Sequence, residues 1–409
     1  MADIEAGNRQ YWIMLFMLEV KMIKKSETNN AIVTKLCNVR PHPNADKLQL
    51  ATVLGTQVIV GLDAVEGQLV IYFDSNLRLS HEYLCCNNLY SNKELNKDQT
   101  QKGYFGKSGR VRAQKFRGEV SNGFVAELNS LRNVIPPGLY DLMEGDEFTS
   151  INNIKICEKY FIPKDFQGQS KKQKKLVSDM FHKHWDTKQL MREKDSIPEN
   201  AKCYVEEKIH GTSGRTGNVL CQINRGWKFW KPKEEWRVIS GTRRMDNIDF
   251  HLSPIRQEIE RRVAPHLHRG EETYYEIYGY DGGKEIQPGF HYDCRPGEWK
   301  CMLYRVTITT PDGFCIDLDR ESVYKRAEEL GLEKPYYFGE SNKRLIDGDI
   351  RDLCRGQSKL DSGTLREGVV IWFKDKSNCW TCLKHKSEEF LILEDKQKEQ
   401  EQTDAEDSL

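Results

Sequence analysis

The stretch Glu207-Lys208-Ile209-His210-Gly211-Thr212-Ser213 indicates how the second half of this chain folds. It continues the run Cys203-Tyr204-Val205-Glu206, which is typical of a strand. A lysine at the end of a strand can lie in a pocket, where desolvation and neighbouring cations favour its uncharged, nucleophilic amine. A glycine soon after it lets the backbone approach a bound sugar and phosphate. The stretch predicts a lysine that attacks the α-phosphate of a nucleotide, although an exposed strand lysine before a turn fits the same pattern.

Further patterns follow downstream in a fixed order. The segment 274–279, Tyr-Tyr-Glu-Ile-Tyr-Gly, predicts a strand that carries Glu276, and Ile286-Gln287 comes shortly after it. The segment 367–372, Glu-Gly-Val-Val-Ile-Trp, predicts a second strand that opens with Glu367. In Leu383-Lys384-His385-Lys386 the alternate lysines would share one face of a strand, because side chains repeat every second residue. Ser240-Gly241-Thr242-Arg243-Arg244 lies between the first two patterns.

This ordered set resembles the covalent nucleotidyltransferases, the superfamily of DNA ligases, RNA ligases and mRNA capping enzymes. His210 after Lys-Ile, the Glu-Ile-Tyr-Gly segment and Ile286-Gln287 look most like the RNA ligase branch. The resemblance covers roughly residues 195–392. It implies an α+β fold, with a nucleotidyltransferase domain at 196–392 built on antiparallel sheets with flanking helices.

The resemblance also implies roles for individual residues. Lys208 would form a covalent lysyl-AMP with ATP. Glu276 and Glu367 would bind the ribose and hold hydrated Mg²⁺ or Mn²⁺, since carboxylates suit these hard cations. Lys384 and Lys386 would contact the α-phosphate and neutralise charge in the transition state.

Other nucleotide contacts are implied less directly. Arg243, or Arg244 beside it, would grip the ribose and the 5′-phosphate end, and Tyr304 would stack on adenine. Glu206, His210 and Gly211 would line the nucleotide pocket around Lys208. Many ligases carry aspartate at the position of His210, where it arranges the waters of the metal. A neutral imidazole cannot supply that charge, so we expect His210 to contact nucleotide or substrate differently, or to be satisfied by the local backbone.

The first part of the chain has a different character. Between residues 31 and 145, short β-type runs at 32–36, 48–54, 57–60 and 69–73 alternate with Gly, Asn and Asp, which predicts a small barrel. The segment 40–48, Arg-Pro-His-Pro-Asn-Ala-Asp-Lys-Leu, resembles the OB-fold tRNA-binding module of some aminoacyl-tRNA synthetases. It also resembles the N-terminal OB domain of the family-5 RNA ligases. We expect an OB-fold domain at 31–160, in which His42 and Asp46 serve turn chemistry.

A basic segment of this region is the candidate nucleic-acid surface. Read as a strand, 107–117 would place several cations on one face, with Tyr104, Phe105 and Phe116 nearby for stacking. A solvated charged face is the alternative. The cations in question are Lys107, Arg110, Arg112, Lys115 and Arg117.

The remaining segments read as connections and ends. We expect an extension at 1–30, a linker at 161–195 that is partly helical near 176–185, and a charged tail at 393–409 that is a frayed helix or disordered. The apolar run 11–18 is too short to span a bilayer and has no basic leader or cleavage site. We therefore expect no secretion signal and no membrane contact.

Composition sets the outer limits on function. Lysine plus arginine and aspartate plus glutamate each number 62, so RNA binding would need a local basic surface. The 12 cysteines are scattered and read as reduced thiols of a cytosolic or nuclear protein. Cys379 and Cys382 form a single C-x-x-C, for which ordinary packing is favoured over zinc. We expect a monomer.

The order of the domains bears on the choice of function. Capping enzymes and most DNA ligases place an OB domain after the last lysine motif, whereas here the barrel region precedes the catalytic region. This order favours an ATP-dependent RNA ligase that joins 3′-OH and 5′-phosphate ends, as at a nicked duplex. ATP is favoured over NAD because no nicotinamide-binding domain is recognisable. The alternatives are a GTP-using mRNA guanylyltransferase and an OB-centred RNA-binding protein with an inactive nucleotidyltransferase domain.

Overall fold

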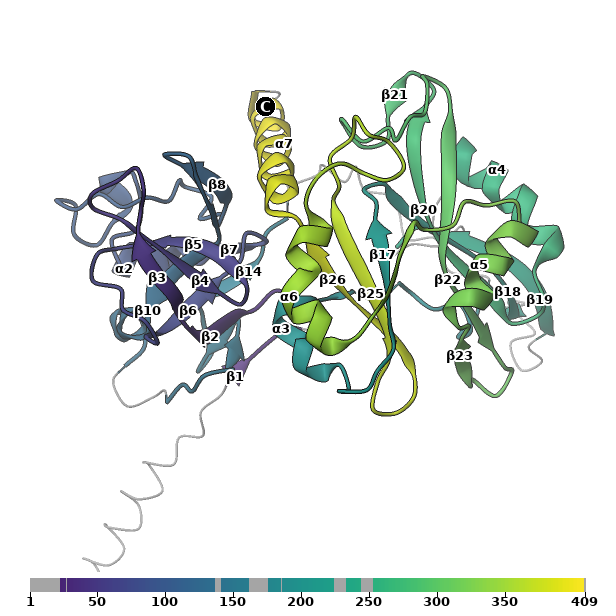
Figure 1. Cartoon of the computed structure of the whole chain (residues 1–409), viewed down its shortest axis with the longest axis horizontal. Coiled ribbons are helices and arrows are strands. Elements are labelled where there is room, and N and C mark those ends of the chain that lie inside the picture. The colour runs from purple at the N-terminus through teal and green to yellow at the C-terminus, as the bar shows by residue number, and fades with distance from the viewer. Residues whose placement is uncertain are drawn as a thin grey trace, which may run out of the picture. The chain divides into compact units, whose positions relative to one another are not determined.

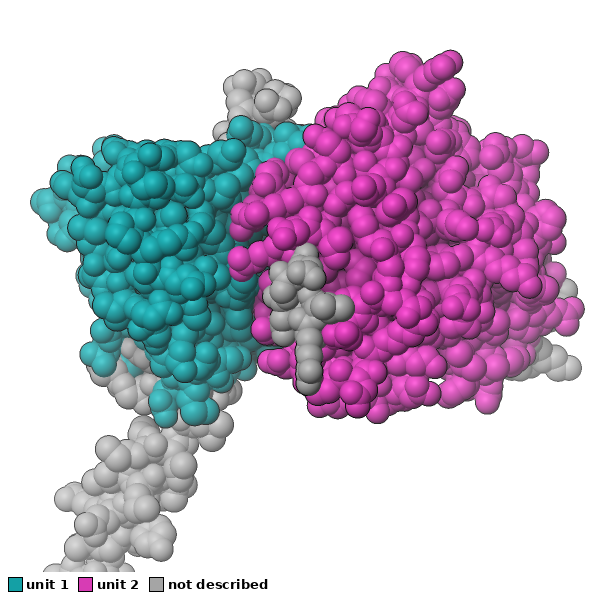
Figure 2. Space-filling model, in the orientation of Figure 1, with its two compact units in different colours: residues 1–164, 391–409 teal, residues 165–390 magenta. Residues whose placement is uncertain are grey.

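A computed structural model describes residues 23–26, 28–136, 141–161, 176–184, 186–223, 233–243 and 253–407 (Figure 1). The chain divides into two compact units (Figure 2). The first contains residues 1–164 and 391–409, and the second contains 165–390. The division at 164 falls inside the predicted linker, whereas the predicted tail is counted with the first unit. None of the described helices is long and apolar enough to cross a membrane.

The first unit is built mainly of short antiparallel strands, and the four runs predicted as strands are confirmed as β2, β4, β5 and β6. One sheet has the order β10-β6-β2-β11 and another the order β3-β4-β5. The elements are β1 Ile23–Lys24, β2 Ala31–Lys35, β3 Cys37–Pro41, β4 Gln49–Val53, β5 Thr56–Val60, β6 Leu69–Phe73, β7 Leu77–Leu79, α2 His81–Cys86, η1 Lys93–Leu95, β8 Ala113–Phe116, β9 Glu119–Asn122, β10 Phe124–Glu127, η2 Leu128–Asn133, β11 Glu147–Phe148, β12 Ser150–Ile151, β13 Ile154–Lys155 and β14 Cys157–Lys159.

The central strands of this unit are buried on both faces. Along β6, Ile71 and Phe73 belong to one apolar cluster while Val70 and Tyr72 belong to a second. Alternate residues of a strand point to opposite faces, so the sheet lies between two cores. An OB topology stays a prediction for this unit.

His42 has the turn role expected from the sequence. Its imidazole is buried, its Nδ1 accepts a hydrogen bond from the Asn44 backbone N–H at 3.0 Å, and its Nε2 lies 3.2 Å from the Phe116 carbonyl oxygen. The Asn44 amide also donates to the Arg117 carbonyl at 2.9 Å. These bonds fix the 42–44 turn to the β8–β9 hairpin.

The second unit contains two larger sheets. The large sheet has the order β15-β18-β20-β22-β23, with β19 on β18 and β21 on β20, and the lysine sheet has the order β16-β26-β25-β17-β24. The elements are β15 Leu176–Val177, β16 Lys188–Gln189, α3 Leu190–Glu193, η3 Lys194–Ser196, β17 Cys203–Lys208, β18 Thr212–Ile223, β19 Lys233–Gly241, α4 Pro254–Val263, η5 Ala264–His266, β20 Glu271–Asp281, β21 Lys284–Glu285, β22 Trp299–Thr309, β23 Cys315–Asp317, α5 Arg320–Glu329, β24 Tyr337–Ser341, α6 Lys343–Cys354, β25 Gly368–Lys374 and β26 Trp380–Lys386. Helix α7, Glu388–Asp407, begins at the end of this unit, and most of its residues belong to the first unit.

Helices cover one face of each sheet (Figure 1). In the lysine sheet, Val369, Ile371 and Phe373 of β25 pack with Ile346 and Ile350 of α6. Residues of the opposite parity on β25 therefore face away from the helices. This alternation leaves the other face of the lysine sheet for the predicted site. The fold of the unit is mixed α+β, with mostly antiparallel sheets.

Two expectations about the connecting segments have different outcomes. The predicted helix near 176–185 is wrong for residues 176–184, where β15 pairs with β18 and a turn follows. Residues 1–22 and 162–175 lie outside the described residues, as does the apolar run at 11–18. The tail region does form a helix, since α7 extends to Asp407.

Candidate active site

The three predicted lysines lie at one end of one face of the lysine sheet. In the pairing register, Lys208 of β17 lies opposite Gly368 of β25, and Gly368 lies opposite Lys386 of β26. Lys384 is on the same face as Lys386 because it lies two residues earlier in the strand. The strand pairing thus brings together lysines that lie far apart in the sequence.

Glu367 joins two of these lysines. Its carboxylate is 1% exposed, with Oε2 lying 2.8 Å from Lys208 Nζ and Oε1 lying 3.1 Å from Lys386 Nζ. Burial alone would raise the pKa of Glu367, but the Lys208 and Lys386 ammonium groups lower it below its ordinary value. The carboxylate is therefore held in its charged form and fixes the Lys208 side chain.

Lys384 lies close to three other positive charges. Burial, followed by the charges of Lys386, Lys208 and Arg243, lowers the pKa of Lys384 to about 8. Glu367 is the nearby anion that opposes this shift. Repulsion among these cations disfavours the charged form of Lys384, and a bound anion such as a phosphate would relieve that repulsion.

The large sheet contributes Glu276 to the site. Glu276 lies on β20 opposite Ser213 of β18, and the Ser213 hydroxyl donates to Glu276 Oε2 at 2.9 Å. Burial raises the pKa of Glu276, while the Lys208 charge and the Ser213 hydrogen bond act in the other direction. The site therefore draws one carboxylate from each sheet.

Gly211 allows this close approach between strands. A Cβ at this position would lie 2.3 Å from the Ile277 carbonyl oxygen, so any side chain would push β20 away. The Gly211 carbonyl accepts a hydrogen bond from the Gln287 amide at 2.8 Å. The Ile-Gln pattern seen in the sequence thus supports the turn that follows Lys208.

His210 lies among aromatic rings. Phe290 and Phe390 each meet its imidazole edge-on with ring centroids 5.0 Å apart, and its backbone N–H donates to the Tyr292 hydroxyl at 2.6 Å. Its Nδ1 is 3.8 Å from Glu367 Oε2. Sequence reasoning missed these three aromatic residues, because aromatic side chains alone carry no signal that distinguishes a site from a core.

Arg243 lies close to Lys384, and Tyr304 lies close to Glu276 and Arg243. The Arg243 guanidinium pairs with the Asp186 carboxylate, a partner that the sequence did not suggest. Tyr304 is half-buried, and its hydroxyl is buried without a hydrogen-bond partner among the described residues. His184 meets its ring edge-on with centroids 5.7 Å apart. Nucleotide contact by these two residues stays a prediction, and Arg244 lies outside the described residues.

Glu206 has a different place from the one predicted. Although it shares the strand face of Lys208, its carboxylate accepts from Arg320 Nε at 2.8 Å and from the Tyr324 hydroxyl. Arg320 also donates to the Tyr304 carbonyl at 2.8 Å and lies over the Trp372 ring at 4.4 Å. Both partners of the pair are buried, and Glu206 Oε1 holds Arg320. Nucleotide contact by Glu206 stays a prediction.

The predicted basic strand in the first unit is wrong in part. Only Ala113–Phe116 is a strand, so the side-chain alternation does not extend back to Lys107. Arg110 is buried, pairs with Asp395 and lies over the Tyr160 ring, which removes it from a nucleic-acid surface. Arg112 is half-buried, whereas Lys107, Lys115 and Arg117 are exposed and stay candidates for contact.

The donor atoms fit a divalent cation that is bound mainly through water and phosphate. The charge of Glu367 contributes to raising the pKa of Glu276, and a cation between the two carboxylates would relieve this repulsion. No group of three or more His, Cys, Asp or Glu residues suited to a metal occurs in the described part of the chain. Cys379 is exposed and Cys382 is buried, and both are free thiols.

Comparison with known proteins finds similarity in structure only. No protein-family model and no curated protein matches the sequence. A structure of a Naegleria gruberi RNA ligase variant without ligand matches with a TM-score of 0.61 at 15% identity, covering 89% of this chain and 98% of that one.

Two liganded structures of the same Naegleria gruberi enzyme also match. A variant with ATP and Mn gives a TM-score of 0.58 at 16% identity, covering 90% of this chain and 98% of that one. The form with pyrophosphate gives 0.57 at 16% identity, covering 88% and 97%. The chain therefore shares the fold of these RNA ligase structures over most of its length.

Proposed function

We propose that this chain is an ATP-dependent RNA ligase that joins 3′-OH and 5′-phosphate ends at nicks or breaks in RNA. The observation that carries the proposal is the fixed Lys208 amine, bonded to Glu367 and flanked by Lys384 and Lys386 on one sheet face. The shared fold with an RNA ligase whose structures contain ATP, manganese and pyrophosphate supports it.

In the first step, the Lys208 ammonium would lose a proton to solvent. The free amine would then attack the α-phosphate of ATP, release pyrophosphate and lose a second proton, leaving AMP joined to Nζ as a phosphoramidate. The lowered pKa of Glu367 makes it a poor proton acceptor, so we assign it to orienting the Lys208 side chain. Lys384 and Lys386 would neutralise the negative charge that the α-phosphate gathers in the transition state.

Glu276 and Glu367 would hold hydrated Mg²⁺ or Mn²⁺, which supplies further charge neutralisation at the phosphates when bound. Tyr304 would stack on adenine, and Arg243 would bind the ribose or the 5′-phosphate once a ligand displaces Asp186. Two later steps complete the reaction. AMP passes from Lys208 to the RNA 5′-phosphate, giving a 5′-5′ pyrophosphate end, and the neighbouring 3′-OH then attacks that phosphate and expels AMP.

Label transfer tests the proposal directly. Wild-type protein, Lys208→Ala and the control Lys334→Ala are incubated with α-labelled ATP, GTP or labelled NAD, with Mg²⁺ or Mn²⁺. Lys334 pairs with Glu328 on the surface, and we expect its variant to behave as wild type. We expect label from ATP alone, none on Lys208→Ala, and discharge of the label by 5′-phosphorylated RNA.

The other outcomes separate the alternatives. Labelling by GTP would indicate a guanylyltransferase. Absence of label with every nucleotide would contradict the catalytic proposal and leave an RNA-binding protein. Label that persists on Lys208→Ala would place the nucleophile elsewhere.

A further inference from the structure

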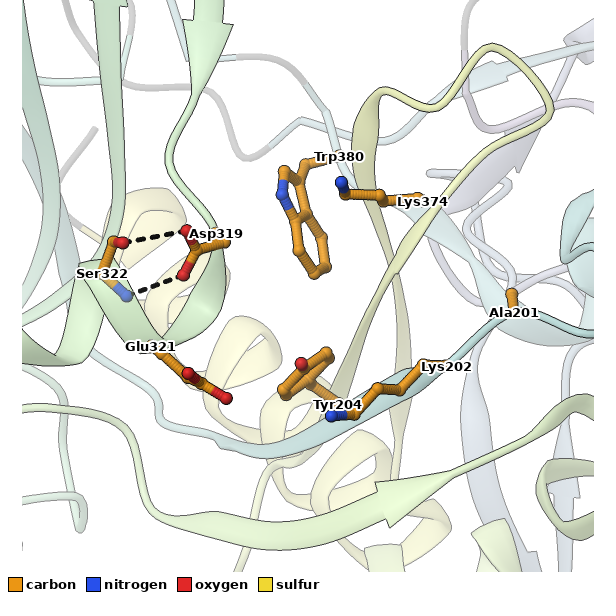
Figure 3. A pocket seen from close by; sticks show the side chains of 8 residues that line it. All are labelled: Ala201, Lys202, Tyr204, Asp319, Glu321, Ser322, Lys374 and Trp380. Carbon is orange, nitrogen blue, oxygen red and sulfur yellow. Dashed lines mark hydrogen bonds between the residues drawn. The ribbon is translucent and has the colours of Figure 1, made fainter.

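A pocket lies at the other end of the sheet face that carries the lysines. It encloses about 450 Å³ between the β25–β26 hairpin, β17 and the start of α5 (Figure 3). Volumes of this order are typical of small-ligand sites. Tyr204 of β17 and Trp380 of β26 form its aromatic wall.

This pocket is separate from the lysine cluster. Tyr204 precedes Lys208 by four residues on β17, and Trp380 precedes Lys384 by four on β26. Four residues of strand span about 13 Å at ~3.3 Å per residue. The buried Glu206–Arg320 pair and Trp372 occupy the face in between. A ligand in this pocket would therefore not be the nucleotide that reacts with Lys208.

The aromatic wall offers a surface for stacking. The rings of Tyr204 and Trp380 lie nearly perpendicular, with centroids 5.7 Å apart and an interplanar angle of 65°. Both side chains are half-buried and line the open volume. Tryptophan and tyrosine in this state present large rigid surfaces on which an unstacked base can lie.

Charged groups at the rim complement the rings. The Lys374 ammonium lies 5.6 Å from the centroid of the Trp380 ring, and among the described residues it has no ion-pair partner. Glu321, on the opposite wall, is exposed and likewise unpaired within the described part of the chain. Asp319 is engaged in capping α5, where its carboxylate accepts from the Ser322 N–H and hydroxyl. One free cation and one free acceptor thus flank the aromatic wall.

We propose that this pocket binds one unpaired nucleotide of the RNA substrate, outside the pair of ends being joined. The base would stack on Trp380 beside the Tyr204 ring, Lys374 would contact its phosphate, and the Glu321 carboxylate would accept from an amino or imino N–H on the base edge. This inference rests on the proposed ligase function. At ~3.4 Å per stacked step, the 13 Å separation corresponds to about four nucleotides from the reactive end.

Substitutions on the β25–β26 hairpin test this inference. The variants are Trp380→Ala and Lys374→Glu, with Lys376→Ala as a matched control, since Lys376 is exposed on the same hairpin and does not line the pocket. Lysyl-AMP formation without RNA should be unchanged in all three. The KM for 5′-phosphorylated RNA should rise about 10-fold in Trp380→Ala and Lys374→Glu, in line with the effect of losing a base–aromatic stack.

An abasic scan then locates the nucleotide. Substrates with one abasic position each, along the first six nucleotides on either side of the junction, should show one position where ligation by wild type weakens about 10-fold. Trp380→Ala should lose that dependence. Unchanged RNA KM in both pocket variants, with normal lysyl-AMP formation, would overturn the inference while leaving the ligase intact.

Failure of the ligase proposal itself is distinguished by a separate measurement. If wild-type protein forms no lysyl-AMP, fluorescence anisotropy of a labelled single-stranded RNA still reports binding. Weaker binding by Lys374→Glu but not by Lys376→Ala would then support the pocket without the chemistry. Equal binding by all variants would overturn it.

Discussion

Two buried carboxylates that pair with cations, Glu367 and Glu206, have opposite surroundings. Glu367 meets Lys208 and Lys386, whose side chains are 26% and 16% exposed, so a ligand can reach both cations. Glu206 meets Arg320, which is 1% exposed and also bonded to a carbonyl of the neighbouring sheet. The comparison shows that burial and charge pairing alone do not mark a catalytic group. What distinguishes the site is cations that remain open to a further anion.

The largest effect should come from breaking the fully buried Glu206–Arg320 pair. Arg320→Ala leaves the Glu206 carboxylate buried without its cation, and we expect a loss of about 3–5 kcal/mol in the free energy of unfolding. Urea denaturation measures this. Arg261→Ala is the control, because Arg261 is 75% exposed and pairs with Glu258 on the surface of α4. A loss below about 1 kcal/mol for Arg320→Ala would show that the pair does not hold the two sheets together.

Removing the charge of Glu367, which pairs with the accessible Lys208 and Lys386, should reduce activity more than stability. Glu367→Gln keeps the size of the side chain but releases the Lys208 amine, so we expect lysyl-AMP formation to slow by about 100-fold. The free energy of unfolding should change by less than about 1 kcal/mol, because Lys208 and Lys386 can be solvated. Glu206→Gln should instead lose stability. Equal stability losses in the two variants would erase the contrast.

The pH dependence should sharpen the comparison with a smaller effect. The pKa of Lys384 is about 8, so its charge is lost as pH rises through 8, and kcat/KM for ATP should then fall up to about tenfold per pH unit. Lys384→Arg should move this fall to higher pH, since arginine stays charged. The same pKa shift changes the stability of the fold in the opposite direction. Below pH 8 the charged Lys384 destabilises the folded state, and this penalty is relieved as pH rises from 8 to 10.5, the pKa of an ordinary lysine. A rate that does not change across this range would contradict the assignment.

Local rules of the sequence account for the strands and for the placing of the lysines. Alternation along 383–386 is enough to put Lys384 and Lys386 on one face, and the Lys208 motif marks the neighbouring strand. The same rules could not assign Glu206, because its partner Arg320 is 114 residues away and only the packing of α5 brings it there. The prediction that Arg110 lies on a nucleic-acid surface was wrong for a similar reason, since its partner Asp395 is 285 residues away. Strand parity predicts which residues share a face, but not which part of that face another element covers.

The place of Asp395 has a consequence for how the chain is made. The first unit consists of two segments of the chain that the second unit separates, and its buried Arg110 pairs with a carboxylate on α7, which is synthesised after the second unit. Protein domains generally fold from the N-terminus during translation. While the second unit is being synthesised, the first segment would hold Arg110 without the Asp395 carboxylate, which disfavours its final packing. Final packing of the first unit is therefore expected only after α7 has left the ribosome.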